Sequence, residues 1–270
     1  VKVRPELRQA TLEAKTDAHH LKPQLDELRT ELQAKAVGSP AYRGLRDTIA
    51  QLERSIVTDV MKSASVICST CIYAGDPRLK GTYFPVVIID ECTQATEPAA
   101  LVPIVAGGAQ QVILVGDHHQ LPPTVKSEVA SKGGLSESLF SRLITDSKLD
   151  VFLLNTQYRM HPKIAEFPAA HFYSGKLLNG VAAQDRPIVP GFDWPQNLPV
   201  AFLNMPGSKE SRGTAGGAKS WINNVEAVHL CDIVKDLLKS HLTPPKSIGI
   251  ITPYSAQVRL IFDLLNHSLK

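Results

Sequence analysis

Two apolar runs that each end in polar residues constrain the fold of this 270-residue chain more than any other feature. The run VVII at residues 86–89 leads directly into Asp90 and Glu91, and the run VILV at residues 112–115 leads into a Gly-Asp pair. Short apolar runs bounded by turn residues are typical of strands that are buried on both faces, as in parallel sheets. Because chemistry in open parallel sheets gathers at the carboxyl ends of the strands, the sequence predicts a site there.

Further apolar runs extend this pattern to an α/β architecture. We expect strands at residues 65–70, 85–89, 111–115, 151–154, 200–203 and 247–251. The 3.6-residue period predicts a helix over residues 221–240 with Ser220 as its N-cap, and a second helix around Ile261. We expect loops at residues 180–199, which are rich in proline and glycine, and at the glycine-rich residues 207–217. Alternating strands and helices favour a parallel sheet, here in two α/β units.

The first sixty residues follow a helical period instead. Small or apolar side chains recur at steps of three and four, at Leu7, Thr11, Ala14, Ala18, Leu21, Leu25, Leu28 and Leu32, then at Leu45, Ile49, Leu52, Ile56 and Val60. This spacing predicts two antiparallel helices within residues 1–62, with a break or kink at Pro23. Both an accessory arm and a coiled-coil spacer or dimerisation element fit such a hairpin.

Composition adds few constraints. The chain has 29 Lys and Arg against 26 Asp and Glu, a formal net charge of +3 that is too small to indicate nucleic-acid binding by itself. Four cysteines are too few for a disulfide framework and favour a reducing compartment, and the pair Cys68 and Cys71 lacks the second pair that a zinc site needs. No run approaches the ~18 apolar residues of a membrane span, so we expect no membrane partner.

Five side chains have the chemistry of a nucleotide-hydrolysing site. Such a site needs a carboxylate pair like Asp90 and Glu91, because one carboxylate holds Mg²⁺ while the other takes a proton from the attacking water. Gln120 supplies an amide for a phosphate oxygen or a water. Arg159 can fork onto phosphate, and the adjacent Tyr158 can stack on a base. Taken singly, each of these elements also occurs as an ordinary strand end, turn or surface arginine.

Four motifs follow one another along the chain. They are DECTQATEP at residues 90–98, GDHHQLPP at 116–123, QYRMHP at 157–162 and TPY at 252–254. In this order they resemble the up-frameshift-type helicases of superfamily 1, the group that contains the nonsense-mediated-decay RNA helicase. The resemblance covers nearly the whole chain, and residues 68–79 and 172–181 look closest to the decay helicase itself. LPPTV at residues 121–125 looks more like related DNA/RNA helicases, which leaves the subfamily open.

The resemblance implies an ATP-dependent helicase that moves along single-stranded RNA or DNA. It implies a partial RecA-like P-loop NTPase helicase core of two parallel-sheet units, with ATP in the cleft between them. Asp90 would hold Mg²⁺, Glu91 would be the general base and Gln120 would read the γ-phosphate. Tyr158 would stack on the adenine, and Arg159 would stabilise the developing charge.

The same resemblance suggests how the chain is organised and what it binds. It implies an N-terminal helical hairpin insertion at residues 1–62, the end of the first RecA-like domain at 63–154 and the start of the second at 155–270. The family's grip on nucleic acid falls at Thr70, Pro123, Thr252, Pro253 and Tyr254. Factors of mRNA decay are expected as partners, and the cytoplasm is the expected location, with the nucleus as an alternative.

One family motif is missing from this sequence. The phosphates of ATP are cradled by a G-x-x-x-x-G-K-[ST] loop upstream of the carboxylate pair, and these 270 residues contain none. The nearest string, GTAGGAKS at residues 213–220, has alanine where glycine is required and follows the pair, so we reject it. The family's last motifs are missing as well. We therefore expect a central part of a longer protein, and negligible ATP hydrolysis by these residues alone.

Two other hypotheses remain open on the sequence. A catalytically incomplete protein without a phosphate loop would bind nucleic acid or a partner in a way that ATP does not change. A dimerisation module would be a dimer that becomes monomeric when residues 1–62 are deleted.

Overall fold

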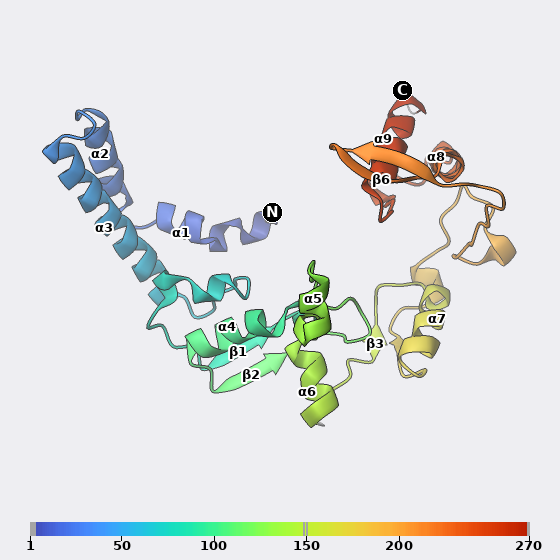
Figure 1. The fold of residues 1–270 in the computed structure, drawn as a ribbon, viewed down its shortest axis with the longest axis horizontal. Coiled ribbons are helices and arrows are strands. Elements are labelled where there is room, and N and C mark those ends of the chain that lie inside the picture. The colour runs from blue at the N-terminus through green and yellow to red at the C-terminus, as the bar shows by residue number, and fades with distance from the viewer. Residues whose placement is uncertain (1–3, 148, 150, 269–270) are drawn as a thin grey trace. The chain divides into compact units, whose positions relative to one another are not determined.

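The computed structural model describes residues 4–147, 149 and 151–268, and its contacts divide the chain into two compact units (Figure 1). The first unit comprises residues Val1–Val151 and the second Phe152–Lys270. Each unit contains its own cluster of buried apolar side chains. Among the described residues, no helix combines the length and apolar character needed to cross a membrane.

The first unit begins with a helical segment. Its elements are a 3₁₀ turn at Pro5–Ala10 and the helices α1 (Leu12–Asp17), α2 (Lys22–Gln33) and α3 (Pro40–Ser63) (Figure 1). The helix expected over residues 7–32 is interrupted, because Pro23 lies in the first turn of α2, where the lack of a backbone N–H costs nothing. Ser39 caps α3 by accepting a hydrogen bond from the backbone N–H of Tyr42 (3.1 Å).

Helices α2 and α3 pack as an antiparallel hairpin. Leu25, Ile49 and Ile56 are buried between them, and all three belong to the apolar period of the sequence. The guanidinium of Arg29 donates to Glu53 across the pair at 2.7 Å. Buried apolar side chains therefore stabilise the contact between the two helices, and an ion pair lies beside them. The role of this hairpin as an accessory insertion stays a prediction.

The rest of the first unit is a small α/β layer. Its elements are β1 (Val86–Ile89), α4 (Glu97–Gly107), β2 (Gln111–Leu114), α5 (Glu128–Ala130), a π-helical turn (Ser131–Leu135) and α6 (Leu139–Ser147), with 3₁₀ turns at Tyr73–Gly75, Pro77–Leu79 and Cys92–Gln94. Strands β1 and β2 pair in parallel, and Ile89 lies opposite Leu114. Ile89 packs with Cys92, Ala100 of α4 and Leu139 of α6, so the buried cluster lies directly beneath the end of β1.

The second unit has two separate strand pairs. Its elements are β3 (Thr156–Gln157), α7 (Pro162–Phe172), β4 (Leu178–Asn179), β5 (Ser211–Ala215), β6 (Ala218–Ile222), α8 (Asn224–Lys239) and α9 (Ser255–Ser268), with 3₁₀ turns at Ala183–Asp185, Pro195–Asn197 and Pro245–Ser247. Strands β3 and β4 are parallel, whereas β5 and β6 are antiparallel. Ala227 and Cys231 of α8 are buried against Ile261 of α9.

Four of the six expected strands are wrong, and two are confirmed. The runs at 86–89 and 111–114 are strands, whereas residues 65–70, 151–154, 200–203 and 247–251 contain no strand. An apolar run becomes a strand only when a neighbour pairs with its backbone, and no strand within the described residues pairs with these segments. Their apolar side chains are accordingly exposed, to 92% at Phe152, 89% at Phe202 and 96% at Ile251.

The glycine-rich loop and the helix start expected after it are also wrong. Residues 211–222 form the β5–β6 hairpin, whose two-residue turn is Gly216 and Gly217. Both glycines have positive φ (57° and 82°), as a type I′ turn requires. Helix α8 therefore begins at Asn224, with Asn223 rather than Ser220 as its N-cap.

The hairpin core leads to a test of stability. We expect Ile56→Ala to lower the free energy of unfolding by about 2–5 kcal/mol, because Ile56 is 2% exposed and its truncation leaves a cavity. The measurement is urea unfolding of the 270-residue chain followed by circular dichroism. Arg46→Ala is the control, since its side chain is 63% exposed and the expected change is within about 0.5 kcal/mol. Equal effects of the two substitutions would contradict this assignment of the core.

Candidate functional site

The carboxylate turn, residues 90–94, follows β1 directly. Asp90 and Glu91 are both exposed there. Glu91 has left-handed backbone angles (φ 51°, ψ 36°), and its N–H donates to Oδ1 of Asp90 at 3.0 Å. The amide of Gln94 donates to Oε2 of Glu91 at 3.1 Å. A non-glycine residue in this conformation is uncommon and clusters at functional sites, so the turn holds two neighbouring carboxylates at some conformational cost.

The sensor turn, residues 116–120, follows β2 at the same edge of the sheet. Oδ2 of Asp117 accepts a hydrogen bond from the amide of Gln120 at 2.8 Å, and Oδ1 accepts from the backbone N–H of His119 at 3.1 Å. Asp117 thereby orients the Gln120 side chain. Because β1 and β2 are parallel and in register, the two turns are neighbours, as the sequence predicted.

A buried thiol lies under the carboxylate turn. Cys92 is 1% exposed, and burial raises the pKa of its thiol to about 11. The thiol is therefore neutral at physiological pH and packs as a small apolar group. Within the described residues, no group of three or more His, Cys, Asp or Glu side chains lies close enough together to hold a metal ion.

An ion pair anchors the helix that follows the carboxylate turn. The guanidinium of Arg142 in α6 donates from Nε and Nη2 to the two carboxylate oxygens of Glu97, each at 2.7 Å. Glu97 is the first residue of α4, where a negative charge is favourable. Hydrogen bonding from Arg142 lowers the pKa of Glu97. Sequence reasoning did not find this pair, because its members are 45 residues apart and neither belongs to a chemical pattern.

The turn that contains Tyr158 and Arg159 is built by the side chain of Gln157. Its Oε1 accepts from the backbone N–H groups of Arg159 (3.0 Å) and Met160 (2.7 Å). Its Nε2 donates to the carbonyl of Met160 (2.9 Å) and to Oδ1 of Asn179 in β4 (2.7 Å). The amide of Gln157 thus replaces the missing backbone partners of a tight turn and ties that turn to β4.

Arg186 secures the same turn from outside. It donates from Nη2 to the carbonyl of Tyr158 (3.0 Å) and from Nε to that of Arg159 (3.2 Å). The Tyr158 ring lies so close to Gly180 that a Cβ at position 180 would collide with it. Tyr158 and Arg159 are nevertheless exposed, and the Arg159 guanidinium makes no hydrogen bond or ion pair with the part of the chain that the structure describes. Sequence reasoning assigned no role to Arg186 or to Gly180, which lie outside the QYRMHP motif.

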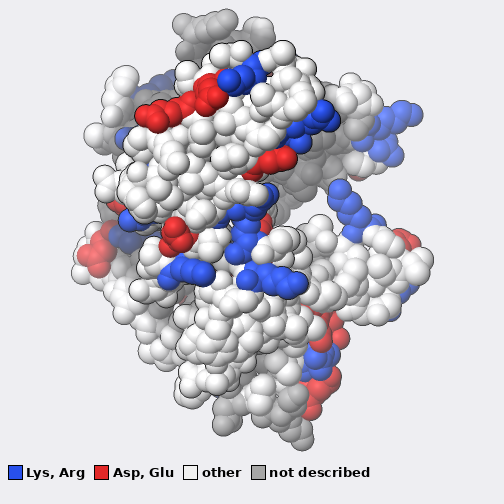
Figure 2. Space-filling model, turned by 90° about the vertical axis from the view of Figure 1, so that its left-hand side faces the viewer, with Lys and Arg blue, Asp and Glu red and all other residues white. Residues whose placement is uncertain are grey.

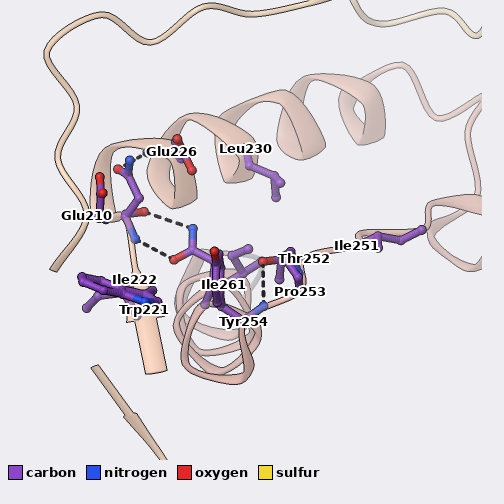
Figure 3. A pocket seen from close by; sticks show the side chains of 12 residues that line it. Glu210, Trp221, Ile222, Glu226, Leu230, Ile251, Thr252, Pro253, Tyr254 and Ile261 are labelled. Carbon is purple, nitrogen blue, oxygen red and sulfur yellow. Dashed lines mark hydrogen bonds between the residues drawn. The ribbon is translucent and has the colours of Figure 1, made fainter. Parts of the chain in front are cut away.

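The TPY segment lines a cavity of about 640 Å³ in the second unit (Figure 3). Figure 3 shows Glu226 and Leu230 projecting from α8, and Thr252, Pro253 and Tyr254 on the segment that leads into α9. The lining also includes Trp221, whose ring is covered by the Arg212 guanidinium at 3.7 Å.

Two lining residues of this cavity, Asn223 and Gln257, are joined by a reciprocal amide contact. The N–H of Asn223 donates to Oε1 of Gln257 (2.9 Å), and Nε2 of Gln257 donates to the carbonyl of Asn223 (3.1 Å). Both residues are buried, so this contact fixes α9 to the start of α8. Gln257 lies three residues after Tyr254, and sequence reasoning did not assign it a role.

The remaining expected nucleic-acid contacts differ in exposure. Thr70 is exposed and Thr252 is half-buried, with Oγ1 of each accepting from a backbone N–H at 3.4 Å. Pro253 and Tyr254 are exposed. Pro123 is buried, so it offers no surface to a ligand in this conformation. Figure 2 shows Lys and Arg in small groups among mostly uncharged residues, in keeping with the modest net charge.

Comparison with known proteins identifies the family. Residues 2–128 match one family model described as "AAA domain", and residues 135–270, half of the chain, match another. The chain therefore belongs to the AAA-domain family that these models describe. The two matches imply a RecA-like P-loop helicase core, which appears here as helices with small parallel strand pairs.

Curated relatives of this chain are named as regulators of nonsense transcripts or as ATP-dependent helicases. The chain is 45% identical over 207 residues to "Regulator of nonsense transcripts 1 homolog" of Drosophila melanogaster, covering 76% of this chain and 17% of that protein. It is 42% identical to "ATP-dependent helicase NAM7" of Saccharomyces cerevisiae, covering 80% and 22%. It is 44% identical to "Regulator of nonsense transcripts 1" of Dictyostelium discoideum, covering 81% and 16%. The chain therefore spans about a fifth of the length of these relatives.

The Glu97–Arg142 pair predicts a specific pH dependence. Since the folded-state pKa of Glu97 is lowered, its stabilising contribution is present above the unfolded-state pKa of about 4.3 and is lost as pH falls through the lower folded-state value. We expect Arg142→Met to lose less stability than the wild type between about pH 6 and pH 3, because the variant has already lost the pair.

The measurement for this prediction is the urea unfolding free energy at a series of pH values. Arg259→Met is the matched control, because Arg259 makes a single 3.2 Å contact with Asp263 on an exposed face of α9. Parallel pH profiles of the wild type and Arg142→Met would contradict the prediction.

Proposed function

We propose that the protein containing these residues is an ATP-dependent helicase that translocates on single-stranded RNA or DNA and acts in mRNA decay. The observation that carries this proposal is the adjacency of the Asp90–Glu91 carboxylates and the Asp117-oriented Gln120 at one edge of a parallel strand pair. The printed names of the relatives, which include "ATP-dependent helicase" and "Regulator of nonsense transcripts", support it. We also propose factors of mRNA decay as partners and a cytoplasmic location, with the nucleus as the alternative.

In this proposal the carboxylate turn binds magnesium and activates water. Mg²⁺ in nucleotide sites is commonly held by one or two carboxylates together with phosphate oxygens and waters, so the exposed Asp90 fits as a ligand. The ion would neutralise charge on the phosphates of ATP. Glu91 would accept the proton of the attacking water, and its hydrogen bond from Gln94 sets the direction of the carboxylate.

The other motif residues would recognise ATP. Gln120 would bond the γ-phosphate, with Asp117 holding its amide in place. Arg159 is suited to stabilise negative charge that develops in the transition state, because its guanidinium is exposed and unpaired within the described residues. Tyr158 would stack on the adenine through the ring face that Gly180 does not cover.

Nucleic acid would be held without sequence readout. Hydroxyl groups and backbone amides at Thr70 and Thr252 can bond phosphates, and the exposed ring of Tyr254 can stack on a base. Pro253 would contribute apolar contact beside that ring. Pro123, which is buried, would support the segment after the sensor turn. The net charge of +3 fits contacts of this kind better than a strongly basic groove.

Glu91→Gln tests the role of the general base. In the full-length protein we expect the turnover of ATP to fall by about 10²–10⁴-fold, because an amide cannot take the proton from water. The affinity for nucleotide should stay within about threefold. Steady-state ATPase assays and titration with a fluorescent ATP analogue measure the two quantities. Glu128→Gln, at a highly exposed carboxylate, is the matched control. Unchanged turnover in Glu91→Gln would refute the assignment.

A second candidate function follows from the missing phosphate loop. These 270 residues contain no G-x-x-x-x-G-K-[ST] string, so they alone would hold ATP weakly and could serve as a nucleic-acid or partner-binding module. In that case binding of a fluorescent single-stranded RNA by the native protein that contains these residues should be the same with and without ATP. An affinity that ATP changes by tenfold or more would favour the helicase instead. Fluorescence anisotropy makes the comparison.

A further inference from the structure

The carboxylate turn and the sensor turn touch through three residues, Cys92, Thr93 and Gly116, which we call the joint. Cys92 and Thr93 are 1% and 2% exposed, although Asp90 and Glu91 just before them are exposed. The backbone N–H of Cys92 donates to the carbonyl of Val115 at 2.9 Å, one residue before Gly116. The joint therefore continues the β1–β2 ladder beyond the strand ends.

Gly116 allows this close approach because it has no side chain. A Cβ at this position would lie 2.9 Å from Sγ of Cys92, 3.1 Å from Cγ2 of Thr93 and 3.2 Å from the backbone nitrogen of Thr93. The φ angle of Gly116 is not positive, so a backbone conformation reserved for glycine does not explain the residue. Lack of space for a side chain explains why glycine occupies this position. By contrast, a Cβ at Gly44 or Gly133 would meet nothing within 4 Å.

Thr93 takes part in the joint through the packing of its side chain and not through a hydrogen bond of its hydroxyl. Its Oγ1 is buried and has no hydrogen-bond partner within the described residues. A buried hydroxyl without a partner does not stabilise the fold. The side-chain atom of Thr93 that lies beside Gly116 is Cγ2, so this side chain meets the sensor turn through a methyl group. Since protein interiors are close-packed, a displaced methyl group would shift the turn that rests on it.

We propose that Thr93 is a positioning residue that fixes the carboxylate turn relative to the sensor turn through its contact with Gly116. Thr93 touches no reacting atom in this proposal, which rests on the proposed ATP hydrolysis. It acts through Glu91, two residues before it, and through Gln120, four residues after Gly116. Misplacement of a catalytic group by about 1 Å can cost ~10²-fold in rate, so a loose joint should lower kcat while the binding of ATP is retained.

Three substitutions in the full-length protein test the joint. Thr93→Ser removes Cγ2 and keeps the hydroxyl, and we expect kcat for ATP to fall about 5–50-fold with KM changed less than threefold. Thr93→Val keeps the shape without the hydroxyl and should restore kcat to within about threefold of the wild type. Gly116→Ala should lower kcat by more than tenfold, because its Cβ pushes the two turns apart. Gly44→Ala is the matched control, since its Cβ enters open space.

A double variant gives the sharpest readout. Thr93→Ser makes room for the new methyl group, so Thr93→Ser with Gly116→Ala should retain more activity than the product of the two single effects predicts. Wild-type kcat in Thr93→Ser overturns the proposal. Loss of activity in Thr93→Val but not in Thr93→Ser also overturns it, because the hydroxyl would then be the working group. If Gly116→Ala fails to fold, the kcat values of Thr93→Ser and Thr93→Val still test the proposal.

This experiment separates failure of the joint from failure of the proposed function. A wild-type protein without ATPase activity would refute the helicase assignment itself. An active wild type with a kcat that is insensitive at position 93 would refute only the joint.

Discussion

The parallel pairing of β1 and β2 is the interaction on which the candidate site depends. It brings two segments that are 25 residues apart into register and places Asp90 beside the sensor turn. At the end of β1, Ile89 packs with Ala100 and Leu139, and the three side chains bury apolar surface there. The polar side chains of Asp90, Glu91 and Gln120, which follow the strands, stay exposed. The apolar cluster thus provides a rigid base for carboxylates that must remain accessible to ligand and water.

Side-chain amides and guanidinium groups hold the remaining motifs in shape. Gln157 satisfies the backbone of the turn that presents Tyr158 and Arg159, and Gln257 does the same for the start of α8. Arg142 fixes α6 to α4 through a two-pronged contact with Glu97. Such planar groups fix orientation as well as distance, so short motifs keep one geometry without long strands around them.

The first unit combines two kinds of stabilisation. Its hairpin gains stability from the seam of Leu25, Ile49 and Ile56, which needs no partner beyond the hairpin itself. The α/β layer instead depends on pairing between strands that a helix separates. Local helical contacts form at low entropic cost, whereas the parallel pair must first close a long loop.

The sequence by itself determined the hairpin seam, the β1–β2 runs and the two turns, because hydrophobic period and adjacency in the chain specify them locally. It misplaced the strands at residues 151–154 and 247–251, since strand formation depends on a neighbour that no local pattern reveals. It also read the Gly216–Gly217 pair as a loop, although that pair indicates a two-residue hairpin. Only the tertiary structure decided the contacts of Gly116 with Thr93 and of Glu97 with Arg142, because packing brings together residues that are distant in the chain.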